Sequence, residues 1–309
     1  MLFKKGSNDN LTPVKRKNIK LEKSLQSLTE KNLEAIFGLE FISTEFQVDN
    51  LRIDTLAFDN ETQSFVIIEY KRNRSFSVVD QGFAYLSQML NKKAEFILEY
   101  NEKREQNLKR NDIDWSQSRI IFIAGSFTTH QQKAINFQDL PIELWEVEEY
   151  KNSLIKYEQL KTPGATASIK DLGTSQTISR ISQEVKKYTI EDHFHEGWDN
   201  SRELFEEIRE RILSLDDQIE ENPVKHYIGY KIAGSVLTAI RIQKSKLIVD
   251  LNRVQPKDLE DPEKEVYYQK NSMKYYNKHM SQFNIKKSED IDYAIFLIKQ
   301  LHKKFADEF

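Results

Sequence analysis

The sequence of 309 residues contains no cysteine. This absence excludes disulfide scaffolds, thiol nucleophiles and zinc sites built from cysteine ligands. Histidine is also scarce, with six scattered along the chain, so a structural zinc site is not expected either.

Long apolar runs and an excess of one charge are missing too. No apolar run approaches the ~18 residues of a membrane-spanning helix, and residues 1–20 lack the apolar segment of a secretory signal. Lys and Arg total 46 against 49 Asp and Glu, a formal net charge of -3, so the overall charge does not indicate a polyanion partner. We expect a cytoplasmic protein without a membrane partner, on which any nucleic-acid surface is local.

The composition and length favour a folded chain with two domains. Hydrophobic residues make up 39% and aromatic residues 11% of the sequence, which is enough to form a core. Domains typically have about 100 to 200 residues. The clearest break is at residues 161–182, where Gly, Ser and Thr replace large apolar side chains. We therefore predict a first domain at residues 1–160, a linker at 161–188 and a second domain at 189–309.

Hydrophobic periodicity predicts an α/β first domain and a smaller α+β second domain. In the first domain we predict helical residues at 20–38, a meander of strands at 41–48, 51–58 and 64–71, a helix from 78 to about 109, a strand at 119–127, a short helix at 131–136 and a strand at 142–147. In the second we predict a helix at 200–215, strands at 227–232, 235–243 and 246–252, and a last helix at 289–306.

Two neighbouring strands carry acids in unusual places. Alternation along residues 64–71 puts Glu69 and Lys71 on the same face, at the end of the strand. In the preceding strand, Asp54 lies among large apolar residues, where an unpaired carboxylate is costly. A hairpin with a short turn brings Asp54 close to Glu69. Two converging carboxylates suit Mg²⁺ or Mn²⁺, and Lys71 adds a positive charge for a phosphate or a hydroxide.

A simpler interpretation of the same residues is a surface ion pair between Glu69 and Lys71, with Asp54 at a solvated strand end. Asp, Glu and Lys are common residues, and short motifs often match by chance. These three residues alone do not decide between the two interpretations.

Further residues resemble the PD-(D/E)XK nuclease superfamily, whose members carry an Asp on one strand and a Glu-x-Lys on the next. Ile53-Asp54 and Glu69-Tyr70-Lys71 match this pattern, and the resemblance covers about residues 22–90. Gln81 and Tyr85 match the Gln-x-x-x-Tyr motif of the branch with RecB-like nucleases and the mismatch-specific endonuclease. The chain departs from the pattern in two places: Ile53 replaces the proline of the family name, and Arg52 replaces a frequent glycine.

The resemblance implies a restriction-endonuclease-like core, a mixed central sheet flanked by helices, and a set of roles. Asp54, Glu69 and the backbone carbonyl of Tyr70 would bind Mg²⁺ or Mn²⁺, and Lys71 would orient or help to deprotonate a water. The other expected site residues are Glu22, for a second ion or a metal-bound water, Gln81 and Tyr85, to position the phosphate or brace Lys71, and Arg52, Arg72 and Arg74, to contact nucleic acid together with Tyr85. For Glu22, an acid that favours the helix N-terminus is an equally good interpretation.

The resemblance therefore predicts a Mg²⁺-dependent endonuclease that hydrolyses phosphodiester bonds in DNA, in repair, restriction or phage defence. One alternative is a nucleic-acid-binding or defence-complex module with latent or lost cleavage. A second is an interaction protein without a nucleic-acid role. Residues from about 189 onward resemble an uncharacterised C-terminal domain that is sometimes labelled a predicted transport protein. We expect this domain to recognise the substrate or to form a homodimer.

Overall fold

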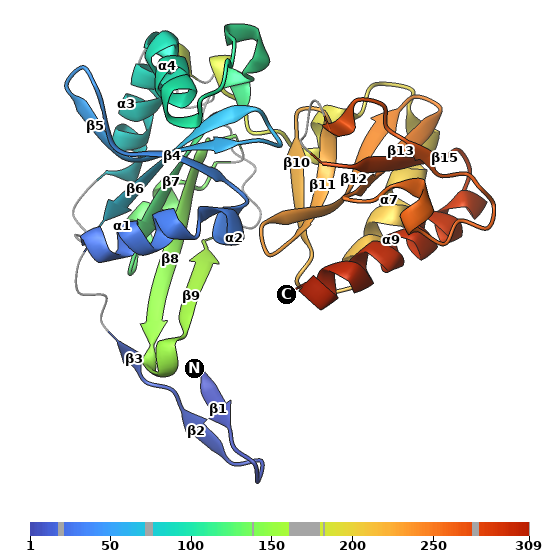
Figure 1. The fold of residues 1–309 in the computed structure, drawn as a ribbon, viewed down its shortest axis with the longest axis horizontal. Helices are drawn as coiled ribbons and strands as arrows, with labels where there is room; N and C mark the ends of the chain where they lie inside the picture. The colour runs from blue at the N-terminus through green and yellow to red at the C-terminus, as the bar shows by residue number, and fades with distance from the viewer. Residues whose placement is uncertain are drawn as a thin grey trace. The chain divides into compact units, whose positions relative to one another are not determined.

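The computed structural model describes residues 1–17, 22–71, 77–137, 139–160, 180–181, 183–273 and 278–308. The chain divides into two compact units, Met1–Lys187 and Tyr188–Phe309 (Figure 1). Most of the predicted linker, at 161–179 and 182, lies outside the described residues. Within the described ranges, no helix has the length and apolar character needed to cross a membrane.

Unit 1 is built around one mixed sheet with the strand order β3-β8-β7-β6-β5-β4, and β9 pairs with β8. Strands β4, β5 and β6 form an antiparallel meander, whereas β6, β7 and β8 run parallel. The strands are β1 (Phe3–Lys5), β2 (Leu11–Pro13), β3 (Arg16–Lys17), β4 (Glu40–Val48), β5 (Leu51–Asp59), β6 (Ser64–Lys71), β7 (Arg119–Ala124), β8 (Ile142–Tyr150) and β9 (Ile155–Gln159); the helices are α1 (Glu22–Lys31), α2 (Leu33–Phe37), α3 (Val78–Asn91), α4 (Lys93–Arg104) and α5 (Thr129–Ala134).

Helices cover both faces of this sheet (Figure 1). Phe65 and Ile67 of β6 pack in one core with residues of α3 and α4, whereas Val66, Ile68 and Tyr70 pack in a second core with residues of α1 and α2. This alternation of side chains is the one predicted for β6. Because both faces of β6 are buried, its sequence is almost continuously apolar. Glu69 shares the face of Phe65 and Ile67, so it points toward the side of α3.

Helix α3 approaches the sheet closely because residue 82 is glycine. A Cβ atom at Gly82 would lie 2.4 Å from Cδ1 of Ile142, a distance that packed side chains do not allow. A larger residue would require the side chain of Ile142 to shift. Gly82 therefore makes room for Ile142 beneath the helix that carries Gln81 and Tyr85.

The structure confirms the predicted α/β class and the meander, and it corrects several predicted boundaries. The helix predicted from 78 to about 109 is two helices, because Lys92 takes the non-helical dihedral angles φ -118 and ψ 33. The break turns α4 so that Phe96 and Tyr100 enter the core. The strand predicted at 119–127 ends at Ala124, and β9 and the N-terminal strands were not predicted.

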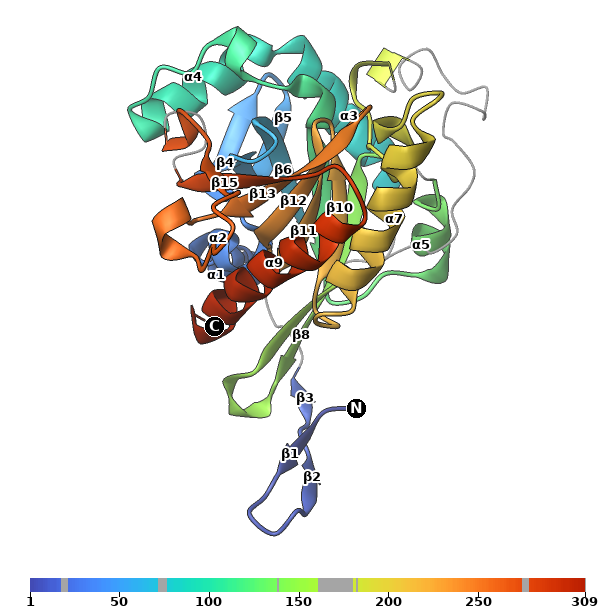
Figure 2. The ribbon, with the colours of Figure 1, turned by 90° about the vertical axis from the view of Figure 1, so that its right-hand side faces the viewer.

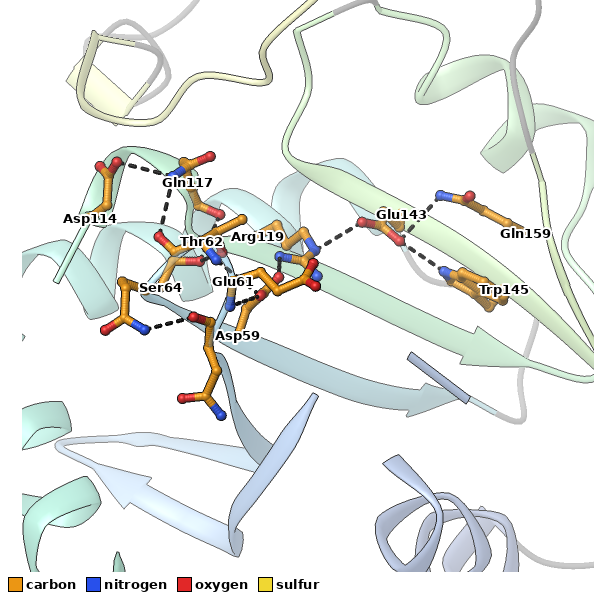
Figure 3. Close-up of polar contacts among 12 residues, drawn as sticks. Asp59, Glu61, Thr62, Ser64, Asp114, Gln117, Arg119, Glu143, Trp145 and Gln159 are labelled. Atoms are coloured by element: carbon orange, nitrogen blue, oxygen red, sulfur yellow. Dashed lines mark hydrogen bonds and ion pairs between the residues drawn. The ribbon is translucent and has the colours of Figure 1, made fainter. Parts of the chain in front are cut away.

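An ion network joins the strands at the end of the sheet where β6 begins (Figure 3). Arg119 of β7 binds Asp59 (Nη1 to Oδ2, 2.9 Å) and Glu143 (Nε to Oε1, 3.0 Å). The backbone N–H groups of Glu61 and Thr62 donate to Oδ1 of Asp59 at 2.9 and 3.1 Å. The side chains of Trp145 and Gln159 donate to Oε2 of Glu143. Every carboxylate oxygen of this network thus has an N–H partner.

Unit 2 is an antiparallel sheet with the strand order β10-β11-β12-β13-β15-β14, and helices α7 and α9 pack on one of its faces through an apolar core. Its elements are α7 (Asp199–Leu213), β10 (Glu220–Val224), β11 (Tyr227–Ile232), β12 (Ser235–Gln243), β13 (Lys246–Asn252), β14 (Tyr267–Tyr268), β15 (Met280–Ile285) and α9 (Glu289–Glu308). The predicted strands at 227–232, 235–243 and 246–252 are confirmed. The sequence analysis missed β10, β14 and β15.

Candidate functional site

The regular strand pairing between β5 and β6 ends at the pair Thr55–Ile68. Beyond that pair, backbone N–H groups donate to carboxylate side chains instead. The backbone N–H of Asp54 donates to Oε1 of Glu69 at 3.1 Å. In return, the backbone N–H of Tyr70 donates to Oδ2 of Asp54 at 3.0 Å. The hairpin therefore brings Asp54 and Glu69 together, and these two hydrogen bonds fix both carboxylates relative to the backbone.

Lys71 completes the group. Its Nζ lies 3.0 Å from Oε2 of Glu69. The side chain of Glu69 is only 2% exposed and that of Lys71 20%, so this is not a surface ion pair. The structure thus joins three of the predicted site residues, Asp54, Glu69 and Lys71, at the end of β6.

The surroundings of Asp54 and Glu69 disfavour the ionised forms of both carboxylic acids. Burial and the neighbouring carboxylate of Asp54 raise the pKa of Glu69 to about 7, although Lys71 lowers it. Burial also raises the pKa of Asp54, against the hydrogen bond from Tyr70 and the charge of Lys71. One ammonium does not compensate the buried carboxylate of Glu69 and the half-buried carboxylate of Asp54. A further cation between them would restore the balance.

The available donors fit a hard divalent cation. Oδ1 of Asp54 accepts no hydrogen bond from the described residues, so one carboxylate oxygen remains for a ligand. Within the described part of the chain, no three His, Cys, Asp or Glu side chains gather closely enough to share an ion. Two carboxylates with water molecules suit Mg²⁺ or Mn²⁺, because Mg²⁺ usually keeps several of its waters.

Helix α3 places Tyr85 beside the carboxylates and carries Gln81 one turn earlier. The hydroxyl of Tyr85 donates to the carbonyl oxygen of Arg52 (3.4 Å). Burial, followed by the nearby charge of Glu69, raises the pKa of Tyr85 above its usual value. Oε1 of Gln81 is buried and has no hydrogen-bond partner within the described structure.

Helix α1 holds the backbone of the site from the other side of the sheet. Nε2 of the buried Gln26 donates to the carbonyl oxygen of Asp54 at 2.7 Å. Glu22 lies one turn earlier, at the exposed start of α1. Gln26, which the sequence analysis did not single out, therefore contacts Asp54 directly from α1.

Arg52 and Glu45 form an ion pair next to Asp54. Nε of Arg52 lies 2.8 Å from Oε2 of Glu45, and Glu45 stands opposite Asp54, between the pairs Thr44–Thr55 and Phe46–Ile53. Glu45 has a positive φ of 55, which is uncommon for a residue other than glycine. Its negative charge raises the pKa of Asp54. No sequence pattern indicated Glu45, because a single acid in a strand carries no periodic signal.

Two of the predicted nucleic-acid contacts cannot be placed: Arg72 and Arg74 lie outside the described residues. The predicted site residues that the structure does place near one another are Asp54, Glu69, Tyr70, Lys71 and Tyr85, with Arg52 alongside.

Comparisons with known proteins place the chain in a family. Residues 190–302 match the model of a domain of unknown function, DUF5655. Over 301 residues the chain is 42% identical to an uncharacterized protein of Haemophilus influenzae, and the match covers 97% of this chain and 98% of that protein. The chain belongs to the same family as this Haemophilus protein. Their similarity spans both units.

Two solved structures of repair-type nucleases are similar to part of the chain. One is a repair endonuclease from Pyrococcus abyssi, with 20% identity, a TM-score of 0.22 and coverage of 38% of this chain and 43% of that chain. The other is an EndoMS complex with double-stranded DNA, with 17% identity, a TM-score of 0.24 and coverage of 42% and 47%. Each match spans less than half of the solved chain. We therefore base the functional proposal on the site itself.

Proposed function

We propose that unit 1 is a metal-dependent PD-(D/E)XK endonuclease of the RecB-like branch, which hydrolyses phosphodiester bonds in DNA. The observation that carries the proposal is the interlocked group of Asp54, Glu69 and Lys71 at the end of β6. The order of these residues along the sequence, followed by Gln81 and Tyr85, supports the same assignment.

In this proposal, Asp54 and Glu69 hold Mg²⁺ or Mn²⁺, with the carbonyl of Tyr70 as a further ligand. The bound ion would lower the pKa of a water molecule and offset negative charge on the phosphate. Asp54 is held for this task by Gln26 and by the N–H of Tyr70. Glu69 must be ionised, which its pKa of about 7 permits only when pH rises or a cation binds.

Lys71 and its surroundings would act on the water and the phosphate. Its ammonium, held by Glu69 at 3.0 Å, orients the attacking water and stabilises negative charge that develops on the phosphate. Gln81 and the hydroxyl of Tyr85 would position the phosphate or brace Lys71. Arg52, fixed by Glu45, would contact a neighbouring phosphate.

The test is cleavage of supercoiled, mismatched and single-stranded DNA with Mg²⁺ or Mn²⁺, using the wild type, Asp54→Asn and Lys71→Met. Asp49→Asn is the matched control, because Asp49 is an exposed acid at the turn before Arg52 that pairs with Lys92. We expect cleavage by the wild type and the control, and none by the two site variants or with EDTA. Equal activity of all four proteins, or no cleavage by any, would contradict the proposal.

DNA binding by the wild type without cleavage would instead favour the alternative, a nucleic-acid-binding or defence-complex module with latent activity. Binding should then be unchanged in Asp54→Asn. Cleavage of RNA but not of DNA would keep the site chemistry and correct the substrate.

A further inference from the structure

Asp54 is the only residue of the described strand β5 that takes part in neither of its two strand ladders. The ladder to β4 passes from Thr55 directly to Ile53, and the ladder to β6 ends at Thr55. Two side chains bind the backbone of Asp54: its N–H donates to Glu69, and its carbonyl oxygen accepts from Gln26. Side chains therefore hold the backbone where the strand pairing is interrupted.

Gln26 belongs to α1, which lies on the side of the sheet opposite α4 (Figures 1 and 2). Its side chain is buried. Its Nε2 donates to the carbonyl oxygen of Asp54 at 2.7 Å, to Oε1 of Glu30 at 3.0 Å and to Oγ1 of Thr44 at 3.0 Å. The two hydrogens of this amide are thus shared among three acceptors, of which the carbonyl of Asp54 is the nearest.

Glu30, one turn further along α1, determines which end of the Gln26 amide faces Asp54. Oε1 of Glu30 also accepts a hydrogen bond of 2.6 Å from Oγ1 of the buried Thr55. An ionised carboxylate only accepts hydrogen bonds, so the amide must turn its NH₂ group toward Glu30, and not its oxygen. The same NH₂ group reaches the carbonyl oxygen of Asp54. Glu30 therefore orients Gln26 toward Asp54.

The contact of Gln26 does more than tie α1 to the sheet. Thr29 of the same helix already makes such a tie, since its hydroxyl lies 2.9 Å from the hydroxyl of Tyr157 in β9. Gln26 instead reaches the residue of β5 that both ladders skip, and this residue carries an acid of the candidate site. A side chain in this position orients a metal ligand without binding the ion itself.

We propose that Gln26 and Glu30 are positioning residues of the metal site formed by Asp54 and Glu69. Glu30 orients the amide of Gln26. Gln26 holds the backbone of Asp54, so that the carboxylate of Asp54 keeps the hydrogen bond from the N–H of Tyr70. Neither Gln26 nor Glu30 contacts the ion. This inference rests on the proposed function, because it requires a metal ion at Asp54.

The first test is a calorimetric titration of Mn²⁺ into the full chain, as wild type, Gln26→Met, Glu30→Gln and the double variant. Methionine has nearly the length of glutamine but donates no hydrogen bond, so we expect Gln26→Met to weaken Mn²⁺ binding about tenfold. Glu30→Gln should weaken it about threefold. The double variant should bind like Gln26→Met alone, because Glu30 acts through Gln26. Additive losses in the double variant would overturn the proposed order.

Thr29→Val is the matched control, because it removes a buried polar group of the same helix whose hydrogen bonds run to Leu25 and Tyr157. This variant should keep the wild-type affinity for Mn²⁺, whatever its free energy of unfolding. The electron paramagnetic resonance spectrum of the bound Mn²⁺ should change in Gln26→Met and not in Thr29→Val, since a loss of stability alone does not alter the ligands around the ion. Equal changes in both variants would overturn the proposal.

The positioning role and the metal site fail in different ways. A wild type that binds no Mn²⁺ would overturn the metal site and this inference with it. Wild-type binding that Gln26→Met leaves unchanged would overturn the positioning role alone, and the metal site would stand. If Gln26→Met does not fold, the isosteric Glu30→Gln decides the question: an unchanged affinity overturns the role, and a threefold loss supports it.

Discussion

The two ends of the unit 1 sheet contain the same kinds of groups in different arrangements. Each end has two acids and one cation: Asp54, Glu69 and Lys71 where β6 ends, and Asp59, Glu143 and Arg119 where it begins. Arg119 bridges its two acids, and every oxygen of those acids has an N–H partner (Figure 3). Lys71 binds Glu69, and Oδ1 of Asp54 has no partner among the described residues.

The difference appears in the pKa values. At the Arg119 end, burial lowers the pKa of the guanidinium, but the charges of Asp59 and Glu143 raise it by more. At the Lys71 end, the pKa of Glu69 rises to about 7 and that of Asp54 rises too. The carboxylates at the Arg119 end share one cation, whereas burial disfavours the ionised acids at the Lys71 end. This contrast supports the proposal that the Lys71 end holds a cation and has a function beyond stability.

The largest expected effect is on catalysis. Asp54→Asn removes a proposed metal ligand, so we expect the rate of DNA cleavage to fall by about a thousandfold or more. Asp59→Asn, at the other end of the sheet, should retain the rate per folded molecule within about threefold. Single-turnover cleavage with Mn²⁺ measures both. A comparable loss in Asp59→Asn would remove the distinction between the two ends.

The next effect is on stability at the structural end. Arg119→Met leaves Asp59 and Glu143 without their shared cation, so we expect the free energy of unfolding to fall by about 3 kcal/mol. Urea denaturation at pH 7 measures this change. A loss below about 1 kcal/mol would show that the network in Figure 3 contributes little to folding.

A stability change of the opposite sign is expected at the site. The folded pKa of Glu69, about 7, is above its ordinary value of 4.5, so the ionised acid destabilises the metal-free fold as pH rises from 4.5 to 7. Glu69→Gln should therefore stabilise the protein by about 2 kcal/mol at pH 8, and by nearly nothing below pH 4.5. Denaturation in EDTA at both pH values measures the difference. A stabilisation that does not depend on pH would contradict the assigned pKa.

The smallest effect concerns the ion pair beside the site. Arg52→Gln should weaken DNA binding about fivefold and reduce its dependence on salt by roughly one phosphate contact. Glu45→Gln frees Arg52 from its fixed position and should weaken binding by about twofold to threefold. In the double variant, the loss should equal that of Arg52→Gln alone, because Glu45 acts through Arg52. If the losses of affinity in a binding titration were additive, they would contradict the claim that Glu45 acts through Arg52.

The residue patterns could predict contacts within one strand or between two strands joined by a short turn. Alternation along β6 placed Glu69 and Lys71 on one face, and a short turn joined β5 to β6 so that Asp54 met Glu69. The helix break at Lys92 was not predictable, since residues 78–109 keep a helical pattern and the break serves the packing of Phe96 and Tyr100.

Long-range contacts were beyond the sequence patterns. Gln26 reaches Asp54 from a helix on the other face of the sheet, and the positive φ of Glu45 leaves no trace in residue spacing. The network of Arg119 joins residues from β5, β7 and β8, which no local rule brings together. Strand β15 was missed because its sequence, Met280–Ile285, mixes polar and apolar side chains on a sheet that is covered by helices on one face.

The most direct test of the central claim is a calorimetric titration of Mn²⁺ into the metal-free wild type, Asp54→Asn and Asp59→Asn. We predict one site per chain in the wild type and in Asp59→Asn, with an affinity that rises by up to about tenfold per pH unit below pH 7, as Glu69 loses its proton. The site should be absent in Asp54→Asn. Equal binding by all three proteins, or none by the wild type, would contradict the claim that Asp54 and Glu69 form a metal site.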